Sequence, residues 1–139
     1  MLYLDSSVAV ALLTNEPHSW RADAWLIAQQ GREIALSRWT ETEVAAALAA
    51  KARVGGLDLQ LLEEARQSFW DFVRSARRLP IAGRHFELAT RFASDVDAKL
   101  RGGDALHLAV ASEGGAVLCT LDRGQAEAAK VLDMPFELI

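Results

Sequence analysis

The sequence contains a single cysteine, Cys119, among its 139 residues. An internal disulfide is therefore impossible, which favours a reducing compartment such as the cytoplasm. Because Cys119 lies in an apolar run, we expect it to be a small buried hydrophobic residue.

Long apolar runs are also missing. Runs such as Val8 to Leu13 are far too short to cross a bilayer. The N-terminus lacks a basic segment followed by an apolar stretch and a cleavage site, so we expect no export signal. These absences predict a cytoplasmic protein that has no membrane partner.

An excess of positive charge is the third absence. The chain carries 15 Lys and Arg against 19 Asp and Glu, a net charge of −4, and its pI is about 5.3. Proteins that hold nucleic acid through bulk charge are basic. A role with nucleic acid therefore requires a local basic patch, a metal ion or a partner subunit.

What the sequence does contain is a regular alternation of short apolar runs and segments with helical periodicity. Its 51% of hydrophobic and 24% of charged residues are typical of a globular protein, and its length predicts one domain over residues 1–139. The predicted strands cover residues 2–5, 33–37, 79–82, 116–121 and 136–138, and the predicted helices cover residues 7–14, 17–30, 40–54, 58–77, 84–100, 104–113 and 124–132. This alternation predicts an α/β fold with a central parallel sheet of four to five strands and helices on both faces.

Two of the predicted strands end in an aspartate. Asp5 follows the first strand, and Asp122 follows the strand that contains Cys119. Parallel strands bring their carboxyl ends to one edge of the sheet, where an α/β fold places its ligands. Two such charges repel each other unless a cation neutralises them, and oxygen ligands favour hard ions such as Mg²⁺ or Mn²⁺.

Each candidate acid also has a structural explanation. Asp5, Asp104 and Asp122 all stand where an aspartate caps the N-terminus of a helix. Thr40 and Glu43 fit a capping box, in which Glu43 would only close the helix start. Glu43 nevertheless shares a face with the small residues Ala46, Ala47 and Ala50, whereas Glu41 is expected to point into solvent.

Taken in order, these acids lie in motifs that resemble those of PIN-domain nucleases, and the spacing and length resemble the VapC-type toxins of bacterial type II toxin–antitoxin pairs. The resemblance covers essentially the whole chain. The Asp104 segment is its most distinctive part. The motifs are Leu4-Asp5-Ser6-Ser7-Val8, Glu43-Val44, Asp104-Ala105-Leu106-His107-Leu108-Ala109 and Thr120-Leu121-Asp122.

The resemblance implies a three-layer α/β/α fold and an endoribonuclease that depends on Mg²⁺ or Mn²⁺. It also implies a homodimer that a small cognate antitoxin inhibits. Asp5, Glu43 and Asp104 match the three core acids of the family, and Asp122 matches a more variable fourth acid. Ser6 matches a hydroxyl residue near the metal, and Thr120 matches a threonine that bonds to a neighbouring carboxylate or to the backbone. Ser7 departs from the pattern, because the family often has asparagine there.

The expected chemistry is attack on an RNA phosphodiester by a water that one or two cations activate. Basic residues near the predicted site elements would contact the phosphates: Arg38, Lys51, Arg53, Arg101 and Arg123. The cluster of Arg74, Arg77 and Arg78 is expected to form a solvated face.

Three other features have weaker functional interpretations. His107 is expected to be a buried structural histidine. Trp39 is expected in the core or at an interface, although it could stack a base. The apolar residues of the helices predicted over 17–30 and 40–54 are candidates for contact with an antitoxin or a second copy.

Three alternative functions remain open from the residues alone. A phosphoryl-transfer enzyme of the haloacid dehalogenase type would need a second aspartate where Ser7 stands. A receiver-like signalling module would need adjacent acids near the N-terminus and a lysine late in a strand-end loop, whereas Arg123 follows Asp122. A PIN-like binding module without activity would be expected to have lost some of the four acids.

Overall fold

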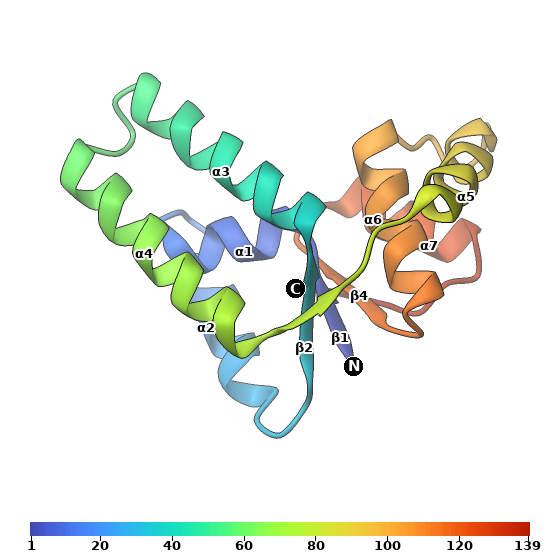
Figure 1. The fold of residues 1–139 in the computed structure, drawn as a ribbon, viewed down its shortest axis with the longest axis horizontal. Coiled ribbons are helices and arrows are strands. Elements are labelled where there is room, and N and C mark those ends of the chain that lie inside the picture. The colour runs from blue at the N-terminus through green and yellow to red at the C-terminus, as the bar shows by residue number, and fades with distance from the viewer.

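A five-stranded sheet forms the centre of the computed structural model, which describes residues 1–139 (Figure 1). All neighbouring strands are parallel, and their order is β3-β2-β1-β4-β5. This confirms the predicted parallel α/β sheet. The strands are β1 (Leu2–Leu4), β2 (Ile34–Ser37), β3 (Arg77–Leu79), β4 (Val117–Thr120) and β5 (Phe136–Leu138).

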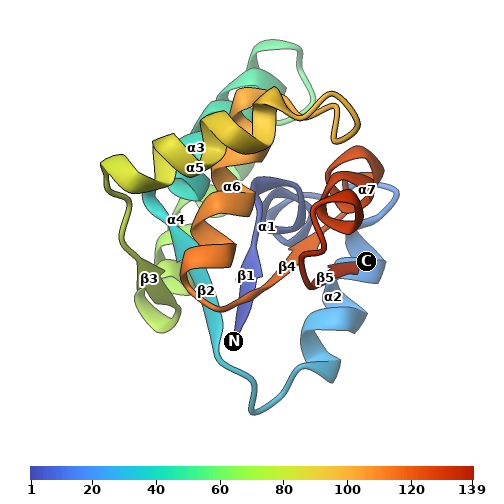
Figure 2. The same cartoon turned by 90° about the vertical axis from the view of Figure 1, so that its right-hand side faces the viewer.

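Seven helices cover the two faces of the sheet, so the fold has three layers (Figures 1 and 2). The helices α1 to α4 pack on one face, against Leu2 and Leu4 of β1, whereas α5 to α7 pack on the other, against Tyr3. Alternate residues of a strand point to opposite faces, so β1 contributes to both cores. The helices are α1 (Ser6–Leu13), α2 (Ser19–Ala28), α3 (Arg38–Arg53), α4 (Leu59–Ser75), α5 (Gly83–Ser94), α6 (Gly102–Glu113) and α7 (Arg123–Val131).

Every predicted element exists, but several boundaries were wrong. The third strand lies at 77–79 rather than 79–82, because Pro80 has no N–H to pair and instead follows the strand. The helix predicted over 84–100 ends at Ser94, and α2 begins at Ser19 rather than at Pro17. Cys119 is fully buried, as predicted. No helix combines the length and the apolarity that crossing a bilayer requires.

The sheet has a switch point between β1 and β4, and this determines where a ligand can bind. From β1 the chain reaches β2 on one side, whereas β4 pairs with β1 on the other side. Helices leaving neighbouring strands in opposite directions open a crevice at the carboxyl ends of those strands. Three helices, α1, α3 and α7, begin within three residues of the end of the strand before them, and their N-termini therefore face this crevice.

Candidate active site

Asp5 lies at the carboxyl end of the central strand and is the most buried of the candidate acids, with 3% of its surface exposed. Its Oδ1 accepts hydrogen bonds from Ser7 Oγ (2.6 Å) and from the Val8 N–H (3.1 Å), which makes it the N-cap of α1. Its Oδ2 accepts a bond from Thr120 Oγ (2.6 Å). Burial raises the pKa of Asp5 even though His107, Ser7 and Thr120 all act to lower it.

Glu43 reaches the same edge of the sheet from the second turn of α3. The N-cap of α3 is Ser37, and Thr40 closes its capping box. The predicted explanation in which Glu43 closes a box on Thr40 was therefore wrong. Glu43 Oε2 instead accepts bonds from Ser6 Oγ (2.7 Å) and from His107 Nε2 (2.7 Å).

The pKa of Glu43 is shifted in the direction opposite to that of Asp5. Burial acts to raise the pKa of Glu43, but the hydrogen bonds from His107 and Ser6 outweigh burial and hold it below the usual value. Glu43 is therefore held as a carboxylate with one oxygen fixed.

His107 belongs to a buried chain of polar groups that the sequence did not reveal. Its Nε2 donates to Glu43, so in the neutral ring Nδ1 is the acceptor for the Tyr3 hydroxyl at 2.8 Å. Tyr3 in turn bonds with Ser37 Oγ at 2.7 Å, and burial raises the pKa of Tyr3, so its hydroxyl stays protonated. His107 is buried as predicted, with 1% exposed, but it connects the core to the carboxylates. The only sequence signal was its position one turn after Asp104.

Asp104 is half-buried in the first turn of α6. The N-cap of α6 is Arg101, so the predicted explanation of Asp104 as a helix cap was wrong. Burial raises the pKa of Asp104, and the neighbouring charges of Asp122, Glu43 and Asp5 raise it further. Asp122, Glu43 and Asp5 are therefore all close enough to Asp104 for their charges to act on it.

Asp122 is the most exposed of the four and is the N-cap of α7. Its Oδ1 accepts bonds from the N–H groups of Gly124 (2.6 Å) and Gln125 (3.1 Å), as the capping explanation predicts. Thr120 links it to Asp5, because the Thr120 hydroxyl accepts from the Asp122 N–H (2.8 Å) while it donates to Asp5.

The donor set at this edge fits a hard cation in its chemistry. The acidic groups are carboxylates, and burial together with the charges of the neighbouring carboxylates raises the pKa of Asp104. Oxygen-only donors of this kind suit Mg²⁺ or Mn²⁺. No three acidic, histidine or cysteine side chains stand in the arrangement of a finished metal centre, so the side chains would have to adjust on binding.

The basic residues proposed for RNA contact fall into two groups. Arg38, Arg101 and Arg123 are exposed at the starts of α3, α6 and α7, around the carboxylates. Lys51 and Arg53 lie at the other end of α3, about 12 Å or more along the helix from Glu43, and Lys51 forms an ion pair with Glu16.

Glu41 is buried rather than solvated, which corrects the expectation from the sequence. It has 7% of its surface exposed and forms an ion pair with Arg78 at 2.6 Å and another with Arg38 at 3.7 Å. Arg78 therefore has a buried partner. All three arginines lie exposed as predicted, and Arg74 and Arg77 pair with the exposed acids Asp71 and Glu33. The contact joins α3 to β3.

Known proteins resemble this chain in sequence and in fold. The family model described as PIN domain matches residues 2–131. Ribonuclease VapC49 of Mycobacterium tuberculosis (strain ATCC 25618 / H37Rv) is 37% identical over 128 residues, which cover 88% of this chain and 85% of the relative.

Two solved structures share the fold. FitAcB from Neisseria gonorrhoeae has a TM-score of 0.71 and 18% identity over 98% of this chain and 96% of that chain. VapBC2 from Rickettsia felis, bound to a DNA fragment from the promoter, has a TM-score of 0.70 and 15% identity over 99% and 98%. They confirm the three-layer PIN-like architecture.

Proposed function

The chain belongs to the PIN-domain family, as a VapC-type ribonuclease of the toxin–antitoxin kind, and we propose that it is an endoribonuclease that depends on Mg²⁺ or Mn²⁺. The observation that carries the proposal is the convergence of four acids at the switch point of the sheet: Thr120 bonds to both Asp5 and the Asp122 backbone, Ser6 next to Asp5 holds Glu43, and Asp104 lies close enough for the charges of the other three acids to act on it. Four carboxylates repel an RNA phosphate, so the site needs a cation before it can accept its substrate.

Asp5, Glu43, Asp104 and Asp122 would hold the cation. When bound, it supplies Lewis acidity, which makes hydroxide available near neutral pH and offsets charge on the phosphate. Ser7 and Thr120 hold the Asp5 carboxylate in place, whereas Ser6 and His107 fix only Oε2 of Glu43. Glu43 therefore keeps Oε1 for a ligand.

The protein's contribution to binding RNA would come from the rim of the site. Arg38, Arg101 and Arg123 are exposed and can contact phosphates on either side of the reacting bond. The helix N-termini that face the crevice add partial positive charge, which favours an anion there.

We assign the cognate antitoxin to a groove between α1, α2 and α4 whose walls are partly apolar and partly polar. Two adjoining cavities are lined by Leu12 and Leu13 of α1, by Leu26 of α2, and by Leu61 and Phe69 of α4. Helix α3, which the sequence suggested as the second wall, contributes only Lys51. An amphipathic antitoxin helix that places apolar residues every three to four positions fits such a groove. We expect the toxin itself to be a homodimer in the cytoplasm.

Cleavage of single-stranded RNA tests the proposed activity. Wild-type protein should cut RNA with Mn²⁺ and not with EDTA, whereas Asp104→Asn should be inactive under both conditions. Asp133→Asn is the matched control, because Asp133 is an exposed acid after the far end of α7, and its positive φ of 52° suits asparagine. Equal cleavage by the wild-type and Asp104→Asn proteins would point to a contaminating nuclease and overturn the assignment.

A further inference from the structure

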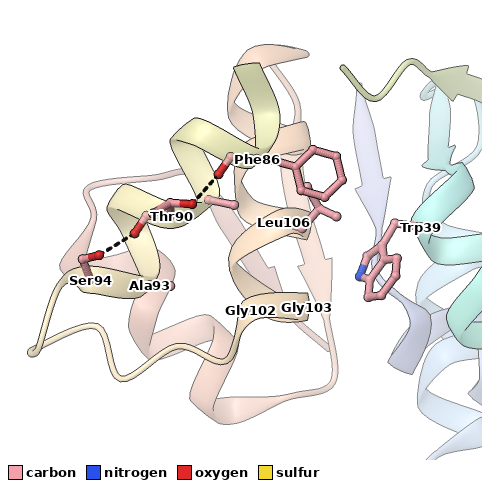
Figure 3. Close-up of a pocket in the computed structure, with 9 residues that line it drawn as sticks. Trp39, Phe86, Thr90, Ala93, Ser94, Gly102, Gly103 and Leu106 are labelled. Atoms are coloured by element: carbon pink, nitrogen blue, oxygen red, sulfur yellow. Dashed lines mark hydrogen bonds between the residues drawn. The ribbon is translucent and has the colours of Figure 1, made fainter. Parts of the chain in front are cut away.

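An apolar cavity of about 480 Å³ opens beside the carboxylates, between the start of α3 and the face formed by α5 and α6 (Figure 3). The indole of Trp39 lies on one side, and the side chains of Phe86 and Leu106 lie opposite. The volume of the cavity is in the range of binding sites for small organic groups, which is about 300–1,000 Å³. We infer that this cavity holds one unstacked base of a single-stranded RNA; the inference rests on the proposed function.

The chemistry of the walls favours a flat aromatic occupant. Thr90 and Ser94 also line the cavity, but their hydroxyls donate to the carbonyls of Phe86 (2.8 Å) and Thr90 (2.7 Å) on their own helix. These walls therefore offer mainly ring faces and methyl groups, and Trp39 Nε1 is the one buried side-chain polar atom that has no hydrogen-bond partner. Bases that leave a stack are held in this way by aromatic side chains, independently of base identity.

Gly103 connects the cavity to the carboxylates. It lines the cavity and immediately precedes Asp104. A Cβ at this position would lie 3.0 Å from Glu43 Oε1 and 3.4 Å from Trp39 Cζ2. A side chain at this position would crowd both Glu43 and Trp39. Because Gly103 lines the cavity and Asp104 follows it directly, a base in the cavity and its phosphate at the acids can be neighbours along one strand.

Two arginines at the rim of the cavity suit a polyanion rather than an apolar protein segment. Arg38 and Arg101 are exposed, and each immediately precedes a residue that lines the cavity, Trp39 or Gly102. Phe86 itself is 55% exposed, so the outer part of the wall is open to a ligand. A strand whose base enters the cavity would place phosphates within reach of both arginines.

Binding of 12-nucleotide oligomers separates the contribution of the base from that of phosphate charge. Labelled oligoadenylate and an abasic oligomer with the same phosphates are titrated with Asp104→Asn protein, and binding is followed by fluorescence anisotropy. Oligoadenylate should bind about tenfold more tightly, as expected for stacking of one base. Adding Phe86→Ala or Phe86→Leu should abolish this difference, whereas Phe86→Tyr should retain it, because only tyrosine keeps a ring.

Trp70→Ala is the matched control, because Trp70 is an aromatic residue of similar exposure, 48%, on α4. It should leave the difference unchanged. The inference is overturned if Phe86→Ala binds both oligomers as its parent does. It is also overturned if Phe86→Ala instead dissociates an oligomer of the chain in light scattering, because the face would then join two copies. The binding assay contains no cleavage step, so its failure is distinct from failure to cleave RNA with Mn²⁺.

Discussion

Three carboxylates of the same site show different pKa shifts, and the cause lies in their individual contacts. Burial raises the pKa of Asp5 and Asp104, whereas hydrogen bonds from His107 and Ser6 lower that of Glu43. Without a cation, ionisation of Asp5 and Asp104 at neutral pH therefore lowers the free energy of unfolding of the protein. Such a cost is expected where charge is arranged for a ligand rather than for stability.

Asp104→Asn should therefore stabilise the protein in EDTA while it abolishes cleavage. The pKa of Asp104 is higher in the folded than in the unfolded protein. The free energy of unfolding therefore falls as the pH rises through the folded-state pKa and Asp104 ionises, and asparagine avoids this loss because it does not ionise. At pH 7 we expect a rise in Tm of about 3 °C, the shift that ~1 kcal/mol causes in a domain of this size. Differential scanning fluorimetry measures it. The gain should shrink as the pH falls toward the unfolded aspartate pKa of about 3.9, and a lower Tm at pH 7 would contradict the argument.

His107→Ala should lower kcat by about 10–100-fold, the usual cost of removing a residue that orients a ligand group. The substitution removes the donor to Glu43 Oε2 and leaves the buried Tyr3 hydroxyl without its His107 partner. KM should change little, because His107 has 1% of its surface exposed and does not reach the RNA. Tyr3→Phe should cost less, because His107 still donates to Glu43. Unchanged kcat in His107→Ala would show that the histidine only fills the core.

At the scale of the elements, the sequence predicted all helices and strands but not the residues that begin the helices. Both Ser37 and Thr40 are good capping residues, and the choice between them depends on where β2 ends. Likewise, α6 begins at Gly102. Arg101 therefore occupies the N-cap position without a side-chain hydrogen bond, and Asp104 lies inside the first turn. These two boundaries decide whether Glu43 and Asp104 are caps or site residues, so their role could not be settled from the sequence.

The junction of α6 with the edge strand β3 gives a prediction about packing. Gly114 ends α6, and a Cβ there would lie 2.6 Å from Leu79 Cδ1 and 3.1 Å from the Val110 carbonyl. Leu79 is buried and cannot move freely, so Gly114→Ala should destabilise the protein by about 1–3 kcal/mol. The midpoint of urea unfolding measures this. Gly83→Ala is the control, since a Cβ there meets nothing within 4 Å, and equal midpoints for both variants would refute the clash.

At the scale of the whole molecule, the sheet order and the contacts between distant segments were beyond the reach of the sequence. The strand ends predicted that Asp5 and Asp122 would share one edge, since parallel strands require it. The bond between Tyr3 and His107 joins residues 104 positions apart, and the ion pair of Glu41 with Arg78 crosses from α3 to β3. Neither contact can be predicted from the periodicity of the sequence, because both depend on the spatial order of the strands.

The net charge of −4 also acts at this scale, and it predicts how RNA binding depends on the cation. Without a divalent ion, the carboxylates repel a phosphate that Arg38, Arg101 and Arg123 attract. RNA resistant to cleavage, such as a 2′-O-methyl oligomer, should therefore bind wild-type protein more tightly in Mn²⁺ than in EDTA. The gain should be much smaller for Asp104→Asn in the same anisotropy assay. Equal gains for both proteins would place the cation effect outside the carboxylate site.

The measurement that tests the central claim most directly is an Mn²⁺ titration in which bound Mn²⁺, by electron paramagnetic resonance, and RNA cleavage are followed in the same samples. Asp5→Asn is the decisive variant, because asparagine still caps α1 but lacks the charge. In the wild-type protein, cleavage should rise in proportion to bound Mn²⁺, and Asp5→Asn should lose both. Cleavage that persists in EDTA, or an Asp5→Asn protein that cuts RNA at the wild-type rate, would contradict a cation-dependent carboxylate site.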